Sequence, residues 1–198
     1  MNKLHLGAGR NILKGWVNTD NHNLPQKRQQ EIRATTLHLD ITEKFNLESD
    51  TFDYIFSEHV IEHIPYVHGR NMISESYRVL KTGGKIRIST PSLEFLIRMY
   101  NEKDSEFMNR YIEFSYKQYN LPGNTDTFVI NNFVRDWGHE FIYDKKTLSD
   151  LLTSTGFTNV CEYNVCESED IHLRDLENVS RLPEGFLQLE TMTLEATK

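Results

Sequence analysis

The sequence lacks the features that mark secreted, membrane-spanning and nucleic-acid-binding proteins. Its 198 residues include only two cysteines, Cys161 and Cys166, whose spacing fits neither a CxxC pair nor a disulfide framework, so we expect free thiols. No apolar run is long enough to cross a bilayer, and the opening stretch MNKLHLGAGR lacks the apolar core of a signal peptide. The net charge of -7 comes without a large basic cluster, which argues against partners such as nucleic acid or an anionic membrane. We therefore expect a cytoplasmic protein.

What the chain does have is an alternation of short apolar segments with longer helical patterns, which is typical of an α/β protein. We predict one domain, 1–198, with a Rossmann-like, doubly wound and mostly parallel sheet that ends in an antiparallel strand pair. The segments predicted as parallel strands are 3–6, 16–19, 36–39, 52–56 and 85–90, and those predicted as the terminal pair are 157–165 and 185–196.

Helices are expected between these strands. Ile73, Tyr77 and Leu80 recur at i, i+4 and i+7, which predicts a helix that the two glycines at 83–84 close. A second helix is predicted over 144–156, where leucines gather on one face before a glycine. Together with the flanking strands, the first helix predicts a right-handed crossover unit.

Residues 92–138 interrupt the alternation and are rich in aromatic residues. We interpret this segment as a helical insertion over the sheet. Its aromatic side chains either form the core of a small subdomain or line a lid over a substrate pocket. These residues are Phe95, Tyr100, Phe107, Tyr111, Phe114, Tyr116, Tyr119, Phe128, Phe133 and Trp137.

Two glycines follow the first predicted strand in LHLGAGRN. Gly7 and Gly9 would let a ligand approach the backbone and let the chain turn sharply. A dinucleotide fingerprint needs a third glycine near position 12, and Ile12 stands there, so a nicotinamide or flavin cofactor loses support. Asp20 ends the next strand, where a carboxylate can accept hydrogen bonds from both ribose hydroxyls of a nucleoside. The alternative is that Asp20 caps a turn with Asn21.

The stretch SEHVIEHIP contains the pattern HxxEH in His59, Glu62 and His63. In zinc hydrolases the two histidines lie one helical turn apart and hold the metal, and the glutamate acts as general base. Pro65 would end such a helix early, and a hydrolase would leave the first three strands unexplained. An HxxEH zinc hydrolase is therefore the weaker hypothesis.

Taken together, LHLGAG with Asp20, HLDI, FDYIFSEHVIEHI and VLKTGGKIRISTP resemble motifs of class I S-adenosylmethionine-dependent methyltransferases, particularly the small type 11 group. The resemblance covers 3–91 well and 138–157 more loosely. Only ten residues separate Gly9 from Asp20, too few for the helix that usually joins these strands, so we expect a more open cofactor pocket. The resemblance implies S-adenosylmethionine as cofactor, with Gly7, Ala8 and Gly9 beside its methionine part, Asp20 on the ribose, Asp40 and Ile41 beside the adenine, and Ser57 near the sulfonium.

The resemblance also bears on the HxxEH pattern. Some methyltransferases, among them small-RNA 2'-O-methyltransferases and quinone O-methyltransferases, bind a divalent metal through a similar ExxEH stretch and a later histidine. By this resemblance His59, Glu62, His63 and His139 are candidate ligands of a metal acting as Lewis acid. Alternatively, Glu62 and His63 tie the sheet to the insertion by hydrogen bonds with no metal. Without a metal, His59 and then His139 are candidates for the base that takes the acceptor's proton.

The leading hypothesis is an S-adenosylmethionine-dependent methyltransferase that transfers its methyl group to a small-molecule acceptor, for example a hydroxyl of a sugar or a related polar metabolite. A second hypothesis is a noncatalytic nucleoside-binding module that keeps the glycine loop and Asp20. A third, an NAD-dependent oxidoreductase, is disfavoured by the missing third glycine. The sequence makes no prediction of the oligomeric state.

Overall fold

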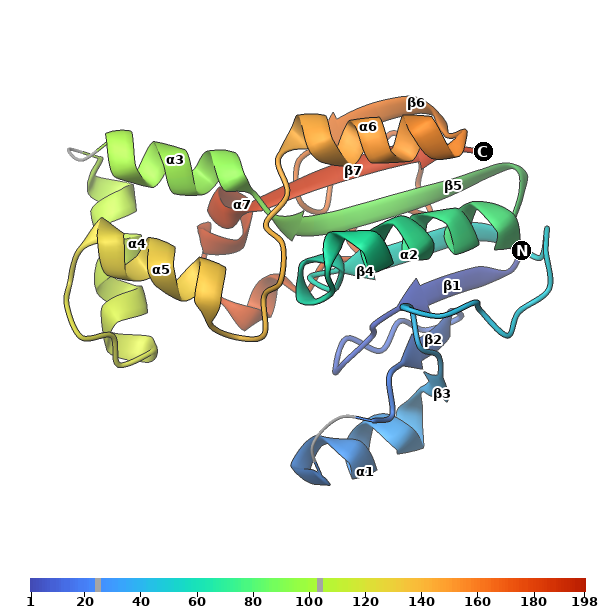
Figure 1. Cartoon of the computed structure of the whole chain (residues 1–198), viewed down its shortest axis with the longest axis horizontal. Coiled ribbons are helices and arrows are strands. Elements are labelled where there is room, and N and C mark those ends of the chain that lie inside the picture. The colour runs from blue at the N-terminus through green and yellow to red at the C-terminus, as the bar shows by residue number, and fades with distance from the viewer. Residues whose placement is uncertain (24–25, 103–104) are drawn as a thin grey trace.

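A seven-stranded sheet forms the centre of the protein (Figure 1), whose computed structural model describes residues 1–23, 26–102 and 105–198. The strand order is β3-β2-β1-β4-β5-β7-β6. The first five strands run parallel, and β7 is antiparallel to both of its neighbours, which confirms the predicted sheet. The strands are β1 (Lys3–Leu6), β2 (Val17–Asp20), β3 (Leu37–His38), β4 (Phe52–Glu58), β5 (Leu80–Pro91), β6 (Thr158–Tyr163) and β7 (Thr191–Thr197).

Two helices, α2 (Tyr66–Val79) and α6 (Lys145–Thr155), cover one face of the sheet (Figure 1). Asp144 caps α6 by accepting a hydrogen bond from the Thr147 backbone at 2.7 Å, and Gly156 ends it with a φ of 115°. Across the described residues, no helix combines the length and apolar character needed to cross a bilayer. The main core lies between these helices and alternate strand residues such as Leu4, Ile55, Ile86 and Leu194.

The helix α2 is shorter than its apolar periodicity predicts. It ends at Val79, and Leu80 already begins β5. Gly83 and Gly84 therefore lie inside β5, where the register between β4 and β5 shifts. A Cβ on Gly84 would lie 2.9 Å from the carbonyl oxygen of Lys81, so glycine is needed there for a close approach of two backbone segments.

The opposite face of the sheet is covered by an extended segment between β6 and the last helix. Leu173 and Leu176 of this segment pack against the sheet. At the centre of the face Arg87 is fully buried, with its guanidinium 2.7 Å from Glu177 and 2.6 Å from Glu195. An ion-paired cluster thus fills a place that apolar side chains usually occupy in a sheet covered on both sides.

No helix separates β1 from β2. The chain passes through 7–16 in turns, as the short connection predicts. The helix α1 (Gln26–Thr35) follows β2 instead and precedes the edge strand β3 (Figure 1).

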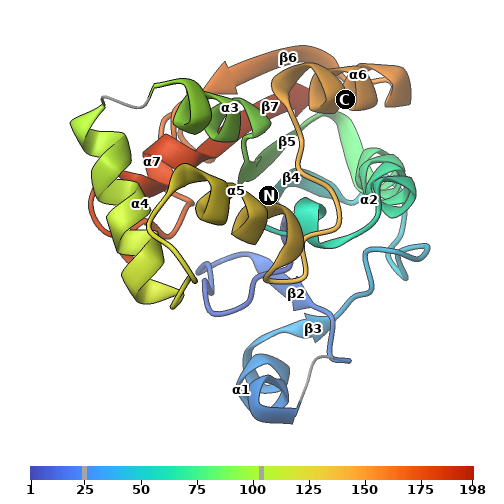
Figure 2. The same ribbon diagram turned by 60° about the vertical axis from the view of Figure 1, so that its left-hand side comes forward.

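The helical insertion lies beyond the carboxyl ends of β4 and β5 (Figures 1 and 2). Its core is separate from the main one, and Phe95, Tyr111 and Phe133 are buried there in mutual ring contact. Tyr100, Tyr116, Phe128 and Trp137 are exposed. Most of its buried aromatic residues thus form a small core, and a lid function remains a prediction. Its helices are α3 (Leu93–Asn101), α4 (Glu106–Gln118) and α5 (Asp126–Arg135).

A short helical segment connects back to the last strand. After η2 (Val179–Arg181), α7 (Phe186–Glu190) leads directly into β7. The prediction of one strand over 185–196 is therefore wrong for the residues of α7, which are helical, and confirmed for those that belong to β7. Phe186 is buried against Tyr111 in the insertion core, and this tertiary contact outweighs the alternating pattern.

Candidate active site

The glycine loop follows β1 at the carboxyl edge of the sheet. Gly7 and Gly9 have φ values of 63° and 51°, a left-handed conformation that glycine tolerates best. Between them, buried Ala8 donates a backbone hydrogen bond to the carbonyl of Thr19. A Cβ on Gly7 would lie 2.3 Å from Val60 Cγ2, whereas a Cβ on Gly9 would meet no heavy atom within 4 Å. Gly7 is therefore required by packing, and Gly9 leaves open space beside the backbone.

Asp20 lies directly against this loop. Its Oδ2 accepts a hydrogen bond from the Gly9 N–H at 2.7 Å, and its Oδ1 accepts one from the Asn21 N–H at 2.7 Å. Each carboxylate oxygen has a further acceptor position, so Asp20 can hold the loop and still bind a ribose hydroxyl. The Asn21 side chain reaches Asp40 at 3.4 Å, which links the ends of β2 and β3.

Asp40 and Ile41 lie just beyond β3. Asp40 Oδ1 accepts hydrogen bonds from the backbone and hydroxyl of Thr42 at 2.9 and 2.6 Å. Burial alone would raise the pKa of Asp40, but Thr42 and the nearby His38 and His68 lower this pKa below its usual value. Ile41 packs partly against the main core. The pair thus offers an ionised carboxylate and a small apolar surface at the expected adenine position.

Ser57 lies inside β4, paired with Leu6 of β1 and Ile88 of β5. It is fully buried, and its Oγ has no hydrogen-bond partner among the described residues. Because Leu6 directly precedes Gly7, Ser57 stands beside the start of the glycine loop. The predicted cofactor residues therefore occupy neighbouring positions along one edge of the sheet.

The HxxEH segment does not lie on an α-helix. His59 continues the β4 ladder by donating its N–H to Ser89 at 2.8 Å, and then turns with a φ of 50°. The following η1 (Ile61–His63) is one turn of 3-10 helix before Pro65. The two histidines are thus not one α-helical turn apart, and the helical context that the hydrolase hypothesis needs is absent.

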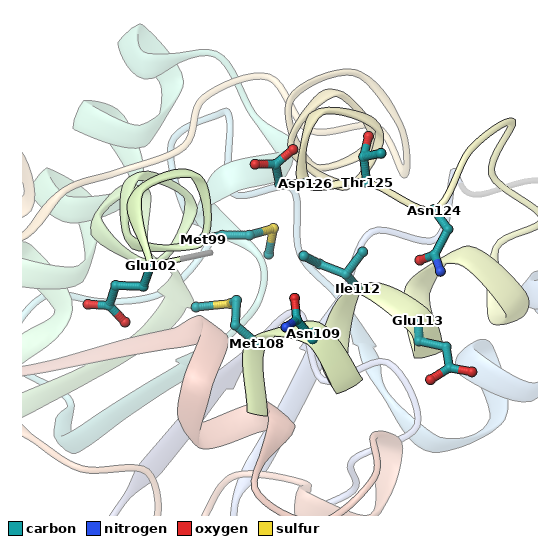
Figure 3. A pocket seen from close by; sticks show the side chains of 9 residues that line it. All are labelled: Met99, Glu102, Met108, Asn109, Ile112, Glu113, Asn124, Thr125 and Asp126. Carbon is teal, nitrogen blue, oxygen red and sulfur yellow. The ribbon is translucent and has the colours of Figure 1, made fainter. Parts of the chain in front are cut away.

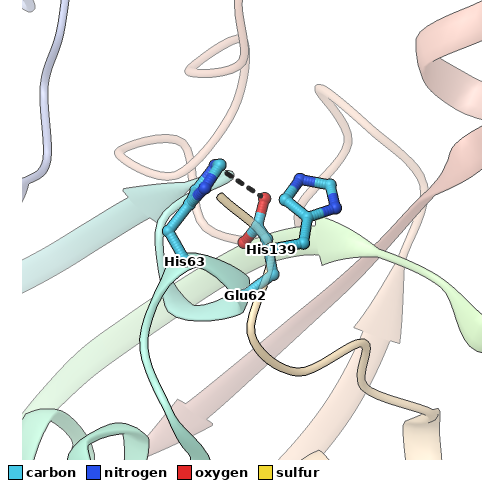
Figure 4. Close-up of side chains that lie close together, drawn as sticks. All are labelled: Glu62, His63 and His139. Atoms are coloured by element: carbon cyan, nitrogen blue, oxygen red, sulfur yellow. Dashed lines mark ion pairs between the residues drawn. The ribbon is translucent and has the colours of Figure 1, made fainter. Parts of the chain in front are cut away.

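Glu62, His63 and His139 come together at this turn (Figure 4). One ligand-type atom from each side chain lies within 4.8 Å of the others, and Glu62 Oε1 is 3.8 Å from His63 Nε2. Glu62 is completely buried, and its Oε2 accepts a hydrogen bond from Thr90 at 3.0 Å. Its Oε1 has no hydrogen-bond partner in the described ranges. Burial alone would raise the pKa of Glu62, but His59 and His63 lower that pKa below its usual value.

His139 reaches the cluster after a sharp turn at Gly138, whose φ is 79°. The next residue, Glu140, donates its N–H to the Glu62 carbonyl at 2.7 Å and so fixes the two segments side by side. His139 Nδ1 lies 2.6 Å from the Phe133 carbonyl oxygen. Because a carbonyl only accepts, Nδ1 carries the proton and Nε2 keeps a free lone pair. Burial lowers the pKa of His139, which favours this neutral ring.

His59 has both ring nitrogens engaged elsewhere. Its Nε2 lies 2.9 Å from Thr191 Oγ1, and its Nδ1 accepts a hydrogen bond from Arg181 at 3.0 Å, since a guanidinium only donates. His59 Nδ1 is also 3.3 Å from Glu62 Oε1, but this contact lacks hydrogen-bond geometry. Of the four residues predicted as metal ligands, three converge and His59 stands beside them.

Arg181, Glu58 and Asn11 are site residues that sequence analysis missed. Glu58 ends β4, is buried, and accepts hydrogen bonds from Asn11 Nδ2 at 3.1 Å and from the Asn178 N–H at 3.0 Å. Burial raises the pKa of Glu58, opposed by His59 and Arg181. A carboxylate at the end of a parallel strand is a recognisable pattern for Glu58. No motif pointed to Arg181, which arrives from a distant segment.

Arg181 also joins the sheet edge to the insertion. Its guanidinium is 3.4 Å from Glu190, and the other oxygen of Glu190 accepts a hydrogen bond from the buried hydroxyl of Tyr111 in α4. Burial beside this carboxylate raises the pKa of Tyr111 well above its usual value, so the hydroxyl keeps its proton. Polar contacts therefore run from the insertion to the HxxEH turn.

A cavity of about 410 Å³ lies inside the insertion, between α3, α4 and α5 (Figure 3). It is separate from the glycine loop and from the histidine cluster, because none of their residues lines it. Its apolar part and its acidic rim come from Met99, Met108, Ile112, Glu102, Glu113 and Asp126.

The sheet order, the glycine loop and the acidic residue on β2 define a class I S-adenosylmethionine-dependent methyltransferase fold. An S-adenosylmethionine-dependent methyltransferase from Archaeoglobus fulgidus has a TM-score of 0.58 and 17% identity, over 100% of this chain and 86% of that chain. One from Mesorhizobium loti has a TM-score of 0.59 and 16% identity, over 100% and 90%. The methyltransferase domain family matches residues 8–162, so the chain belongs to this family.

A curated relative is also similar in sequence. Phosphoethanolamine N-methyltransferase 2 from Caenorhabditis elegans is 26% identical over 141 residues, which are 70% of this chain. The chain spans about a quarter of the length of that relative, since the match covers 25% of it. The predicted methyl donor, S-adenosylmethionine, is confirmed at the level of the family and the fold.

Proposed function

We propose that this methyltransferase acts on a hydroxyl group of a small polar molecule, such as a sugar, held beside Glu62, His63 and His139. The observation that carries the proposal is the free lone pair on His139 Nε2 at the carboxyl edge of the sheet. Val60 packs directly over Gly7, so the turn that carries Glu62 and His63 lies against the cofactor loop. Donor and acceptor positions are therefore neighbours.

Methyl transfer from a sulfonium needs few catalytic groups, because the methyl donor is already activated. The chain must align the acceptor oxygen in line with the methyl group and exclude water. It must also receive the proton that the hydroxyl loses. With no metal ion bound, we propose His139 for this task, because its Nε2 lone pair is free. His59 has no free lone pair, since its two ring nitrogens contact Arg181 and Thr191.

A second candidate acceptor is an amine. Three buried carboxylates, those of Glu58, Glu62 and Glu190, stand at this edge, and the Arg181 guanidinium lies close to two of them, Glu58 and Glu190. An excess of negative charge in a buried place favours a cationic ligand. The relative from Caenorhabditis elegans is named for N-methyl transfer to phosphoethanolamine, which agrees with this candidate. Action on a small molecule in the cytoplasm, without nucleic acid, stays a prediction.

Calorimetric titration with S-adenosylhomocysteine tests the donor site. Asp20→Ala should weaken binding by about 1.5–3 kcal/mol, because a charged hydrogen bond to the ribose is lost. Asp20→Asn is the matched control for shape, and it should retain part of the affinity. A folded wild-type protein that does not bind S-adenosylhomocysteine would contradict the proposed donor site.

Turnover with labelled S-adenosylmethionine and a panel of sugars and small amines tests the acceptor. His139→Ala should lower kcat by about 10²–10⁴-fold while the affinity for S-adenosylhomocysteine is unchanged. Unchanged turnover in His139→Ala would refute its role as base. Binding without transfer to any acceptor would favour the noncatalytic nucleoside-binding module.

A further inference from the structure

The cluster of Glu62, His63 and His139 has the composition of a metal site (Figure 4). We propose that the chain binds a divalent transition metal ion, such as Zn²⁺ or Mn²⁺, through Glu62 Oε1, the His63 imidazole and His139 Nε2. The proposal concerns three ligands, and it stands whether the methyl acceptor is a hydroxyl or an amine. Because the ion would take the lone pair of His139 Nε2, the role of His139 as base applies to the metal-free protein.

Glu62 Oε1 gives the first argument. This oxygen belongs to a side chain with no solvent exposure, it accepts no hydrogen bond among the described residues, and it points towards the two imidazoles. Burying a carboxylate oxygen without a partner is costly. The other oxygen is already held by Thr90 at 3.0 Å, which fixes the direction of the free one. A cation between Oε1 and the imidazoles would satisfy this group.

His139 gives the second argument. Its Nδ1–H is donated to the Phe133 carbonyl at 2.6 Å, so the ring orientation and the tautomer are fixed. Metal-binding histidines in general donate their second ring N–H to such an acceptor, which directs the remaining lone pair at the ion. The Glu140 N–H bond to the Glu62 carbonyl, at 2.7 Å, holds His139 next to the carboxylate. The site is therefore built from two segments locked to each other.

The distances require only a small adjustment. Ligand atoms around a tetrahedral Zn²⁺ are about 3.4 Å apart, given bonds of about 2.1 Å. Glu62 Oε1 and His63 Nε2 are 3.8 Å apart, and all three ligand atoms lie within 4.8 Å. The His63 side chain is 38% exposed, so it can turn inwards without disturbing the core. Two imidazoles and one carboxylate leave coordination positions open for oxygen or nitrogen atoms of a substrate.

The sharpest test is calorimetric titration of chelator-treated full-length protein with ZnCl₂ and with MnCl₂, supported by the visible absorption of added Co²⁺. The wild-type protein should bind a single ion. His63→Ala and His139→Ala should each weaken binding by at least about 100-fold, since each removes one of three ligands. His172→Ala is the matched control, because this histidine lies beside Lys3 and Tyr54 at the amino end of the strands.

Glu62→Gln separates binding from folding. The amide keeps the size of the side chain and an oxygen that can accept the hydrogen bond from Thr90, so the metal-free protein should still fold. Added Zn²⁺ should raise the unfolding temperature of the wild type and not that of Glu62→Gln. If Glu62→Gln does not fold, His63→Ala carries the test, because its ring is partly exposed.

Absence of metal binding by the wild-type protein would overturn the proposal, and so would wild-type affinity for the metal in His63→Ala and His139→Ala. Titration of the same metal-free protein with S-adenosylhomocysteine keeps the two proposals apart. Cofactor binding without metal binding would leave the proposed function standing and remove the metal site. Metal binding without cofactor binding would support the metal site and contradict the proposed function.

Discussion

The two glycines of the glycine loop should respond differently to the same substitution. Gly9→Ala places a methyl group in open space, so its only structural cost is the left-handed φ of 51°, about 1–2 kcal/mol. Gly7→Ala has a similar cost from its φ of 63° and also brings a Cβ to 2.3 Å from Val60 Cγ2. Overpacking of this kind costs about 1–3 kcal/mol more. Gly7→Ala should therefore destabilise the protein by about 2–5 kcal/mol.

Binding of S-adenosylhomocysteine should be more sensitive to the substitution of Gly9 than to that of Gly7. The methyl group in Gly9→Ala fills the space that we assign to the cofactor, so the affinity for S-adenosylhomocysteine should fall at least tenfold, or about 1.4 kcal/mol. Urea denaturation measures the stability of each variant, and calorimetry measures binding to the folded protein. The result that would refute this reasoning is a stable Gly9→Ala variant with wild-type affinity, because the cofactor would then not contact the loop at this residue.

A double-mutant cycle checks the steric argument for Gly7. In Gly7→Ala with Val60→Ala, both Val60 Cγ atoms are gone, and the nearest remaining contact of the new Cβ is Val60 Cβ at 3.2 Å. The double variant should therefore be more stable than the sum of the two single changes predicts, by about 1–3 kcal/mol. Simple additivity would show that the contact with Val60 does not determine the cost.

Two further predictions concern buried charges. Burial lowers the pKa of His5 to about 4, so between about pH 4 and 6.5 the unfolded chain binds a proton that the folded chain does not. The free energy of unfolding should therefore fall as the pH drops below about 6.5, by about 2 kcal/mol between pH 7 and 5. His5→Gln should lose this part of the pH dependence in urea denaturation, and an unchanged slope would contradict it. Arg87→Ala leaves Glu177 and Glu195 buried without their cation and should cost about 3–5 kcal/mol in the same assay. Arg98→Ala, on an exposed pair, should change stability by less than about 1 kcal/mol, and equal effects of the two arginine changes would contradict this account.

Hydrophobic periodicity predicts the parallel strands well, because the alternation of each strand with its neighbouring segments is visible in the local sequence. It fails where a distant contact decides the local structure. The segment of α7 alternates like a strand, but Phe186 is buried in the core of the insertion, and the backbone turns into a helix to place it there. At the start of β5, the helical pattern of α2 runs on to Leu80, which pairs with Phe52 in the sheet instead.

The same distinction separates the predicted from the missed site residues. Gly9 and Asp20 come together because neighbouring parallel strands bring their carboxyl ends to the same edge of the sheet, and this follows from their positions in the chain. The sequence favours His59 as the base because this residue directly follows β4. Its lone pair is instead taken by Arg181, a residue more than a hundred positions away that lies in no recognisable motif. The preference for His139 depends on the Phe133 carbonyl, which only the folded chain places beside the ring.

The segment between β6 and α7 explains why this fold works with so short a connection between its first two strands. It covers the face of the sheet that lacks a long helix, and Arg87 anchors it there through Glu177. The next residue, Asn178, donates its N–H to Glu58 at the end of β4, and Arg181 follows at the HxxEH turn. One segment thus both closes the core and supplies polar residues to the edge of the candidate active site. The buried arginine therefore supports the position of Asn178 and Arg181 beside the end of β4, because the same stretch of backbone connects them to Glu177.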